Sequence, residues 1–120
     1  MVPFAGYEMP MQYASGIIKE HLHTRSSAGL FDVSHMGQAF LAGDDAARAL
    51  ETLTPADKDG QMRYALLLSD AGGIKDDFMA ARLPAERALY LVVNAATKDS
   101  DFAYIAERTH RYKRGSRSET

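Results

Sequence analysis

Two adjacent carboxylates, Asp76 and Asp77, follow the glycine pair Gly72-Gly73 in the segment AGGIKDDFM (residues 71–79). Side chains on a strand alternate between its two faces, so only one of these carboxylates can share a face with the core. On a buried or clefted face, desolvation raises the pKa of a carboxyl group, and the group can hydrogen-bond a nitrogen-containing ligand or accept its proton. The glycines would let such a ligand approach the backbone closely. The alternative is that both aspartates are ordinary polar residues next to a turn.

A second candidate site is the segment Asp32-Val33-Ser34-His35, which contains a serine, a histidine and an aspartate. Catalytic triads assemble from distant segments, so this clustering favours a hydrogen-bonded corner over a triad. His21 and His23 are two positions apart on a predicted helix and face different directions, which argues against a shared metal ion. The sequence has no cysteine and no Gly-x-Gly-x-x-Gly, P-loop or His-Glu-x-x-His motif. We therefore expect no metal site and no nucleotide or zinc-hydrolase chemistry.

The composition is that of a folded soluble protein. Of the 120 residues, 46% are hydrophobic and 25% are charged, which is close to the averages for globular domains. No apolar run approaches the roughly 20 residues that a membrane span needs, and residues 1–6 resemble neither a secretory signal nor an Arg-rich presequence. We therefore expect a cytoplasmic protein that does not enter a membrane.

The charge is distributed unevenly. Residues 1–107 carry 9 basic and 15 acidic side chains, whereas residues 108–120 carry 5 basic side chains and 1 acidic side chain. The acidic body argues against a nucleic-acid surface. The basic end is either a solvated, disordered tail or a phosphate contact, and terminal Gly/Ser/Arg stretches favour the first.

Turn and cap signals predict a series of short elements. Residues 3–14 are expected to form an extended, partly buried arm, and Ser15 and Gly29 would bound a helix at about 16–27. The elements expected after it are a strand ending at Gly43, a helix capped by Asp44 or Asp45 and stopped by Pro55, strands at 64–68, 74–83 and 88–94, and a last helix capped by Thr97.

One helix after the first of these strands and one after the last predict an α+β fold. We expect an antiparallel sheet with flanking helices, of the split βαβ (ferredoxin-like) type. That topology requires one more strand after the last helix, where the sequence has its basic end.

Four segments together resemble one family. They are MVPFAGYEMPMQY (1–13), AGLFDVSHMG (28–37), AGGIKDD (71–77) and LYLVVNAATKDSDFAYI (89–105). In their order and spacing they resemble the N-terminal part of the aminomethyltransferase of the glycine cleavage system, the T-protein. The resemblance implies a tetrahydrofolate-dependent transferase. Such an enzyme moves the methylene group from the aminomethyl-lipoyl arm of the H-protein to tetrahydrofolate and releases ammonia.

The resemblance also implies roles for single residues. Asp77, the second aspartate of the pair, would hydrogen-bond the folate nitrogen that attacks the methylene carbon, and so position and activate it. Tyr64 matches a tyrosine on the pterin side, Met36 a residue that lines the folate pocket, and Asn94 the asparagine next to the catalytic strand. Asp77 would then face the folate cleft, and Asp76 would face away from it.

The implied organisation has three parts. Residues 1–32 are the arm and helix of a first, incomplete domain, residues 33–109 are the α+β folate-binding domain, and residues 110–120 are a basic, disordered tail. Because the family's chains hold roughly three domains of ordinary size, we expect this chain to be a truncated N-terminal part that needs the others to complete the folate site. Two alternatives remain open: a non-catalytic folate-binding module, and a vestigial domain that serves protein–protein interaction.

Overall fold

The computed structural model describes residues 1–54 and 60–115, with side chains described as far as His110. Two compact units make up the chain, Met1–His35 and Met36–Thr120. The boundary follows His35, three residues after the end of the first part expected from the sequence, at residue 32.

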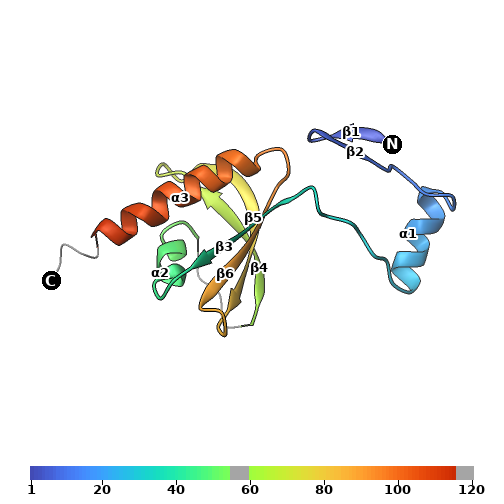
Figure 1. Ribbon diagram of the computed structural model, residues 1–120. Helices are drawn as coiled ribbons and strands as arrows, with labels where there is room; N and C mark the ends of the chain where they lie inside the picture. The colour runs from blue at the N-terminus through green and yellow to red at the C-terminus, as the bar shows by residue number, and fades with distance from the viewer. Residues whose placement is uncertain (55–59, 116–120) are drawn as a thin grey trace. The chain divides into compact units, whose positions relative to one another are not determined.

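The first unit consists of a hairpin and a helix (Figure 1). Strands β1 (Val2–Phe4) and β2 (Tyr7–Met9) pair antiparallel. Ala5 and Gly6 make the turn between them, both with positive φ. The first part of the expected extended arm is therefore a hairpin. The sequence gives only a weak signal for it, because each strand has three residues.

Helix α1 (Ile17–Ser26) lies close to its predicted position, but both predicted end signals are wrong. Its N-cap is Gly16, with φ of 81° and no side-chain hydrogen bond, so Ser15 is not the cap. Gly29 is not left-handed. A Cβ on Gly29 would lie 2.6 Å from Thr24 Oγ1, so this glycine is needed for close packing rather than for a helix-ending turn.

The second unit is built on a four-stranded antiparallel sheet with the strand order β3-β6-β5-β4. Helix α2 follows β3, and helix α3 follows β6. The connection through α2 joins the edge strand β3 to the opposite edge strand β4, and β6 and β5 lie between these two strands. The predicted α+β class, an antiparallel sheet with flanking helices, is confirmed. The elements are β3 (Gly37–Ala42), α2 (Ala46–Glu51), β4 (Met62–Leu68), β5 (Ile74–Leu83), β6 (Ala88–Val93) and α3 (Lys98–Gly115).

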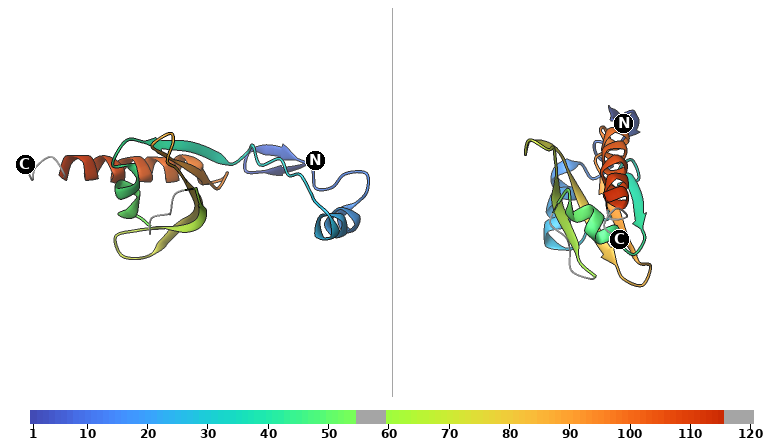
Figure 2. Two further views of the ribbon diagram at one scale, coloured as in Figure 1. Left: turned by 90° about the horizontal axis from the view of Figure 1, so that it is seen from below. Right: turned by 90° about the vertical axis from the view of Figure 1, so that its left-hand side faces the viewer.

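Both helices of this unit pack on one face of the sheet, and Figure 2 shows them against the strands from two further directions. Leu67, Leu91 and Val93 are fully buried there, and each contributes roughly 1.5–3 kcal/mol by its burial. The core that joins helices and sheet comprises Ala46, Leu50, Leu53, Leu67, Phe78, Ala80, Leu89, Leu91, Val93 and Ile105.

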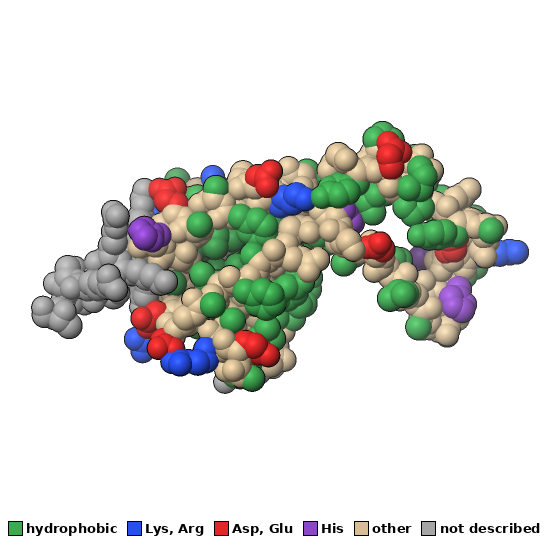
Figure 3. All heavy atoms as spheres, in the orientation of Figure 1, with side chains coloured by type: hydrophobic (Ala, Val, Ile, Leu, Met, Phe, Trp, Pro, Cys, Tyr) green, Lys and Arg blue, Asp and Glu red, His purple; other side chains and the backbone are tan. Residues whose placement is uncertain are grey.

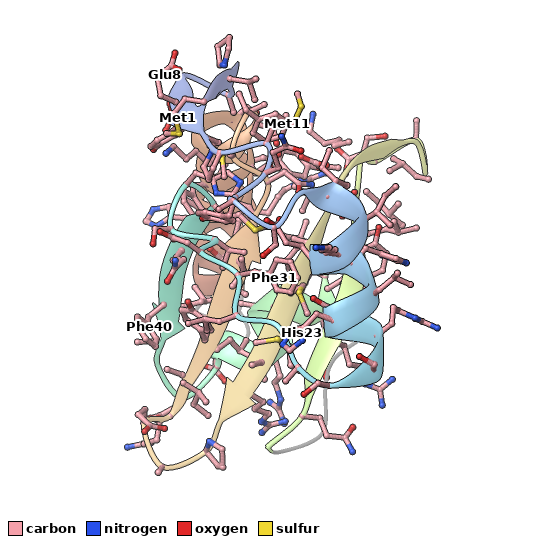
Figure 4. All side chains as sticks on the ribbon, turned by 90° about the vertical axis from the view of Figure 1, so that its right-hand side faces the viewer. Met1, Glu8, Met11, His23, Phe31 and Phe40 are labelled. Carbon is pink, nitrogen blue, oxygen red and sulfur yellow. The ribbon has the colours of Figure 1, made fainter. Side chains whose placement is uncertain are left out.

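The opposite face of the sheet, which we call the open face, carries the alternate residues of each strand. Phe40 of β3 is 65% exposed and projects outward from its strand (Figure 4). The centroid of its ring lies 5.2 Å from the ring centroid of Tyr90 on β6. Apolar side chains thus reach the surface over the strands (Figure 3). The large exposed apolar residues of this face are Phe40, Met62, Tyr64, Leu66 and Met79.

Several ends of elements differ from the sequence prediction. Helix α3 continues to Gly115 and so includes part of the predicted tail, and no strand follows it among the described residues. Asp45 is the N-cap of α2 but makes no side-chain cap hydrogen bond. Pro55, the predicted stop of α2, lies outside the described residues, as do residues 116–120 of the predicted tail. Within the described ranges, no helix has the length and apolarity that a membrane span requires.

Candidate functional site

Asp76 and Asp77 point to opposite faces of the sheet. Phe78 and Ala80 of the same strand belong to the core beneath the helices, and alternation along β5 places Asp76 on their side. Asp77 has the opposite parity and lies on the open face with Met79. Both aspartates are half-buried.

On the open face, Asp77 is paired with a tyrosine. In the β4–β5 register Leu66 lies opposite Asp77 and Tyr64 opposite Met79, so all four side chains share one face. The hydrogen bond to the Asp77 carboxylate is the main cause that raises the pKa of the Tyr64 phenol, and the charges of Asp77 and Asp76 add to it. A protonated phenol at this position can donate to the Asp77 carboxylate. The arrangement combines a hydrogen-bond acceptor, a donor and apolar surroundings.

On the helix face, Asp76 is held by three donors. Its Oδ1 accepts the backbone N–H of Asp77 at 2.8 Å and the Nδ2 of Asn94 at 3.0 Å, and its Oδ2 accepts the hydroxyl of Thr97. The Thr97 hydroxyl is the main cause that lowers the pKa of Asp76, and burial opposes it. Asp76 is thus an ionised anchor between β5 and the start of α3, and not a group on the open face.

Asn94 follows the last residue of β6 and forms a hydrogen bond with the Asp77 backbone. Its Nδ2 donates to Asp77 O at 3.1 Å as well as to Asp76. The last β5–β6 pair is Phe78 with Val93, so the side-chain amide of Asn94 takes the place of a partner on β6 for Asp77. A direct contact of Asn94 with folate stays a prediction.

Met36 lies at the same end of the sheet as Asn94. It precedes Gly37, which pairs with Val93 on β6, and it is half-buried. It has the parity of Gln38 and Phe40, whose side chains are on the open face. The structure therefore brings Tyr64, Asp77 and Asn94 together, and places Met36 two strands away from β5 at the same sheet end.

Two further residues of this site, Thr97 and Asp101, were not predicted as site residues. Asp101 is only 4% exposed, and its Oδ2 is buried without a hydrogen-bond partner. Burial is the main cause that raises the pKa of Asp101, and neighbouring Asp76 contributes to the same direction. Helical spacing could have predicted the burial of Asp101, because it lies four residues before the buried Ile105 and shares its helix face.

The other candidate of the sequence is a corner, as predicted. The backbone N–H and the hydroxyl of Ser34 both donate to Asp32 Oδ1, at 2.9 Å and 2.6 Å. The ring of His35 lies edge-on to those of Phe4 and Tyr7, with centroids 5.8 Å and 6.2 Å away. These contacts do not form a triad. In residues 1–54 and 60–115, no group of three or more His, Asp or Glu side chains could hold a metal ion.

Comparisons with known proteins identify the family of this chain. Residues 1–119 match the family described as the GCVT N-terminal domain. The aminomethyltransferase of Synechococcus sp. (strain CC9902) is 48% identical over 116 residues, which are 90% of this chain and 32% of that protein. The mitochondrial aminomethyltransferase of Dictyostelium discoideum is 44% identical over 117 residues, which are 94% of this chain and 28% of that protein.

A solved structure shows the same fold. The crystal structure of glycine cleavage system aminomethyltransferase T from Bartonella henselae matches with a TM-score of 0.81 and 45% identity, over 89% of this chain and 30% of that one. The chain thus spans about a third or less of the length of these relatives. The resemblance seen in the sequence is confirmed, and the chain belongs to the family of GCVT N-terminal domains.

Proposed function

We propose that this chain is the N-terminal part of an aminomethyltransferase of the glycine cleavage system. The methylene group would pass from the aminomethyl-lipoyl arm of the H-protein to tetrahydrofolate, and the amino group would leave as ammonia. The names of the relatives support this activity. The structural observation that carries the proposal is the division of the aspartate pair, with Asp77 beside Tyr64 on the open face and Asp76 anchored on the helix face.

The residues on the open face fit a reduced pterin. Asp77 offers a carboxylate acceptor, which is what the N–H groups of such a ring system require. The exposed ring of Tyr64 and the neighbouring Met79 and Leu66 offer apolar surface to a flat ligand. Met36 and Asn94 would complete the folate side of the pocket from the same end of the sheet.

Asp77 would act on the attacking nitrogen. By accepting a hydrogen bond from the folate N–H, its carboxylate would hold the nitrogen in line with the methylene carbon and draw its proton away as the bond forms. A hydrogen bond donated by Tyr64 would keep the carboxylate oriented toward the open face. Tetrahydrofolate is thus the proposed acceptor and the lipoylated H-protein the proposed partner.

The test is substitution of Asp77 in the full-length enzyme, by which we mean an aminomethyltransferase of the family's full length that carries this sequence as its N-terminal part. Asp77→Asn should lower kcat about 10²–10⁴-fold, the range of a lost acid–base group, while tetrahydrofolate still binds. Asp76→Asn keeps an acceptor oxygen for the Asp77 N–H and should lose no more than about 10-fold.

Asp99→Asn, on the exposed side of the first turn of α3, is the control and should match the unmodified enzyme. Undiminished transfer by Asp77→Asn, with folate bound, would refute the catalytic role of Asp77, whereas a full-length enzyme that binds folate without transfer would favour the non-catalytic folate-binding module. Equal losses for the substitutions of Asp76 and Asp77 would refute the assignment of the two faces.

A further inference from the structure

We propose that Asp101 is a positioning residue for Asp77: its carboxyl group donates a hydrogen bond to Asp76, and Asp76 with Asn94 holds the backbone of Asp77 in place. The inference rests on the proposed function, in which Asp77 contacts the attacking nitrogen. It concerns a residue of α3 that lies on the helix side of the sheet and does not share the open face with Asp77.

The first step is that Asp77 has a partner on β4, Leu66, but none on β6. Pairing between β5 and β6 ends at Phe78 and Val93, so the N–H and the carbonyl of Asp77 extend past the end of β6. Asp76 accepts this N–H at 2.8 Å, and Asn94 donates to this carbonyl at 3.1 Å. The side chains of Asp76 and Asn94 thus satisfy the backbone groups of Asp77, as the β5–β6 hydrogen bonds satisfy those of Phe78. The orientation of the Asp77 carboxylate depends on these two side chains.

The second step is the orientation of the Asp76 carboxylate. Its Oδ1 is occupied by the N–H of Asp77 and by Asn94, and its Oδ2 receives the hydroxyl of Thr97. Asp101 is in hydrogen-bonding contact with the same carboxylate and also contacts Thr97. Thr97 and Asp101 are one helical turn apart, and they hold Asp76 from the start of α3.

The third step is the location of the proton. Two carboxyl groups can hydrogen-bond each other only when one of them carries a proton. Asp76 has three other donors and is the carboxylate, whereas Asp101 is 4% exposed and has an Oδ2 without a partner, which suits a neutral acid. Burial raises the pKa of Asp101, and donors led by Thr97 lower the pKa of Asp76, as this division requires.

Other charged groups change this division little. Two groups oppose the rise in the pKa of Asp101: the Thr97 hydroxyl, whose effect is second to that of burial, and Lys75 of β5, whose effect is the smallest. Strand β6 carries only Tyr90 as an ionisable group, and Tyr90 is on the open face, bonded to Gln38. The charged residues of α2, Arg48 and Glu51, are exposed.

The test compares three variants of the full-length enzyme. Asp101→Ala removes the donor and should lower kcat about 10–100-fold, the range for loss of a residue that orients a reacting group, with KM within about threefold. Asp101→Asn restores an uncharged donor and should recover most of that loss. Asp99→Asn removes an exposed acid from the same helical turn and is the matched control.

The outcomes separate this inference from the proposed function. If Asp77→Asn abolishes transfer but Asp101→Ala retains kcat within about threefold, the positioning role is wrong and the proposed function stands. Equal losses for Asp101→Ala and Asp101→Asn would also overturn it, since the amide keeps the donor. If Asp77→Asn has no effect on transfer, the role proposed for Asp77, on which this inference rests, is wrong.

A spectroscopic measurement keeps the inference testable even if Asp101→Ala does not fold. In full-length enzyme labelled with 15N-aspartate, the amide signal of Asp77 should shift as the pH rises and Asp101 loses its proton, because this N–H donates to the Asp76 carboxylate that Asp101 contacts. That step should disappear in Asp101→Asn, in which only the acid-side step of Asp76 remains, and persist in Asp99→Asn. An unchanged step in Asp101→Asn would refute the coupling.

Discussion

Gly37 is the position at which one added methyl group should separate α3 from the sheet. A Cβ there would lie 2.7 Å from Val93 Cγ2, 2.7 Å from Lys98 Cβ and 3.0 Å from Phe102 Cε2. Carbon pairs prefer about 3.5–4.0 Å, so these neighbours on β6 and α3 would have to move by roughly 1 Å. Overpacking of this kind costs about 1–3 kcal/mol. The lower chain entropy of unfolded alanine offsets about 0.4–1 kcal/mol. We expect Gly37→Ala to lower the free energy of unfolding by about 1–2 kcal/mol.

Urea denaturation of the 120-residue chain, followed by far-UV circular dichroism, measures this loss. With a slope of about 2 kcal/mol per molar, typical of small proteins, the midpoint should fall by roughly 0.5–1 M. Gly73→Ala is the matched control, because its Cβ would meet only Ser69 Oγ, at 3.3 Å. A loss below about 0.5 kcal/mol for Gly37→Ala, the level of an ordinary surface substitution, would refute the close approach of β3, β6 and α3.

Two further predictions concern the anchor of Asp76. Thr97→Val removes the hydroxyl that donates to Asp76 and should cost about 1–3 kcal/mol of unfolding free energy, whereas Thr97→Ser should retain most of it; equal losses would contradict the role of the hydroxyl. The pKa of Asp76 is lowered by Thr97, so its contribution to stability is present above its ordinary value of 3.8 and is lost as the pH falls through the folded-state pKa. The pKa of Asp101 is raised by burial, so its contribution is present below 3.8 and is lost as the pH rises through the folded-state pKa. Urea curves over a pH series should therefore show a smaller acid-side loss for Asp76→Asn and a smaller loss on the rising side for Asp101→Asn; slopes equal to those of the unmodified chain would contradict the shifts.

Strands β4, β5 and β6 could be predicted from the sequence because alternation, β-branched residues and turn residues agree there. The hairpin at the N-terminus could not, because strands of three residues leave no period to detect. Gly29 shows a second reason. Glycine after a helix usually marks a left-handed turn, but here a contact with Thr24 requires it, and contacts of that kind are not visible in the sequence.

The candidate site could be predicted in part. Alternation alone states that Asp76 and Asp77 face opposite ways, but which face carries the helices depends on how the layers assemble. Asp101 was missed for a different reason. An acidic residue in the first turn of a helix is expected from the helix dipole alone, so its sequence context gives no cause to look for a second role. Only its burial beside Asp76 shows one.

The aspartate pair has a consequence for protein engineering. The backbone of Asp77 is held by Asp76 from the helix side and by Asn94 from the end of β6, while its side chain projects from the open face of the sheet. The residues that hold the backbone of Asp77 are therefore distinct from its reactive side chain. A library that varies position 77 alone would present glutamate, histidine or serine from an unchanged support, so differences in activity among its members would report side-chain chemistry rather than altered folding.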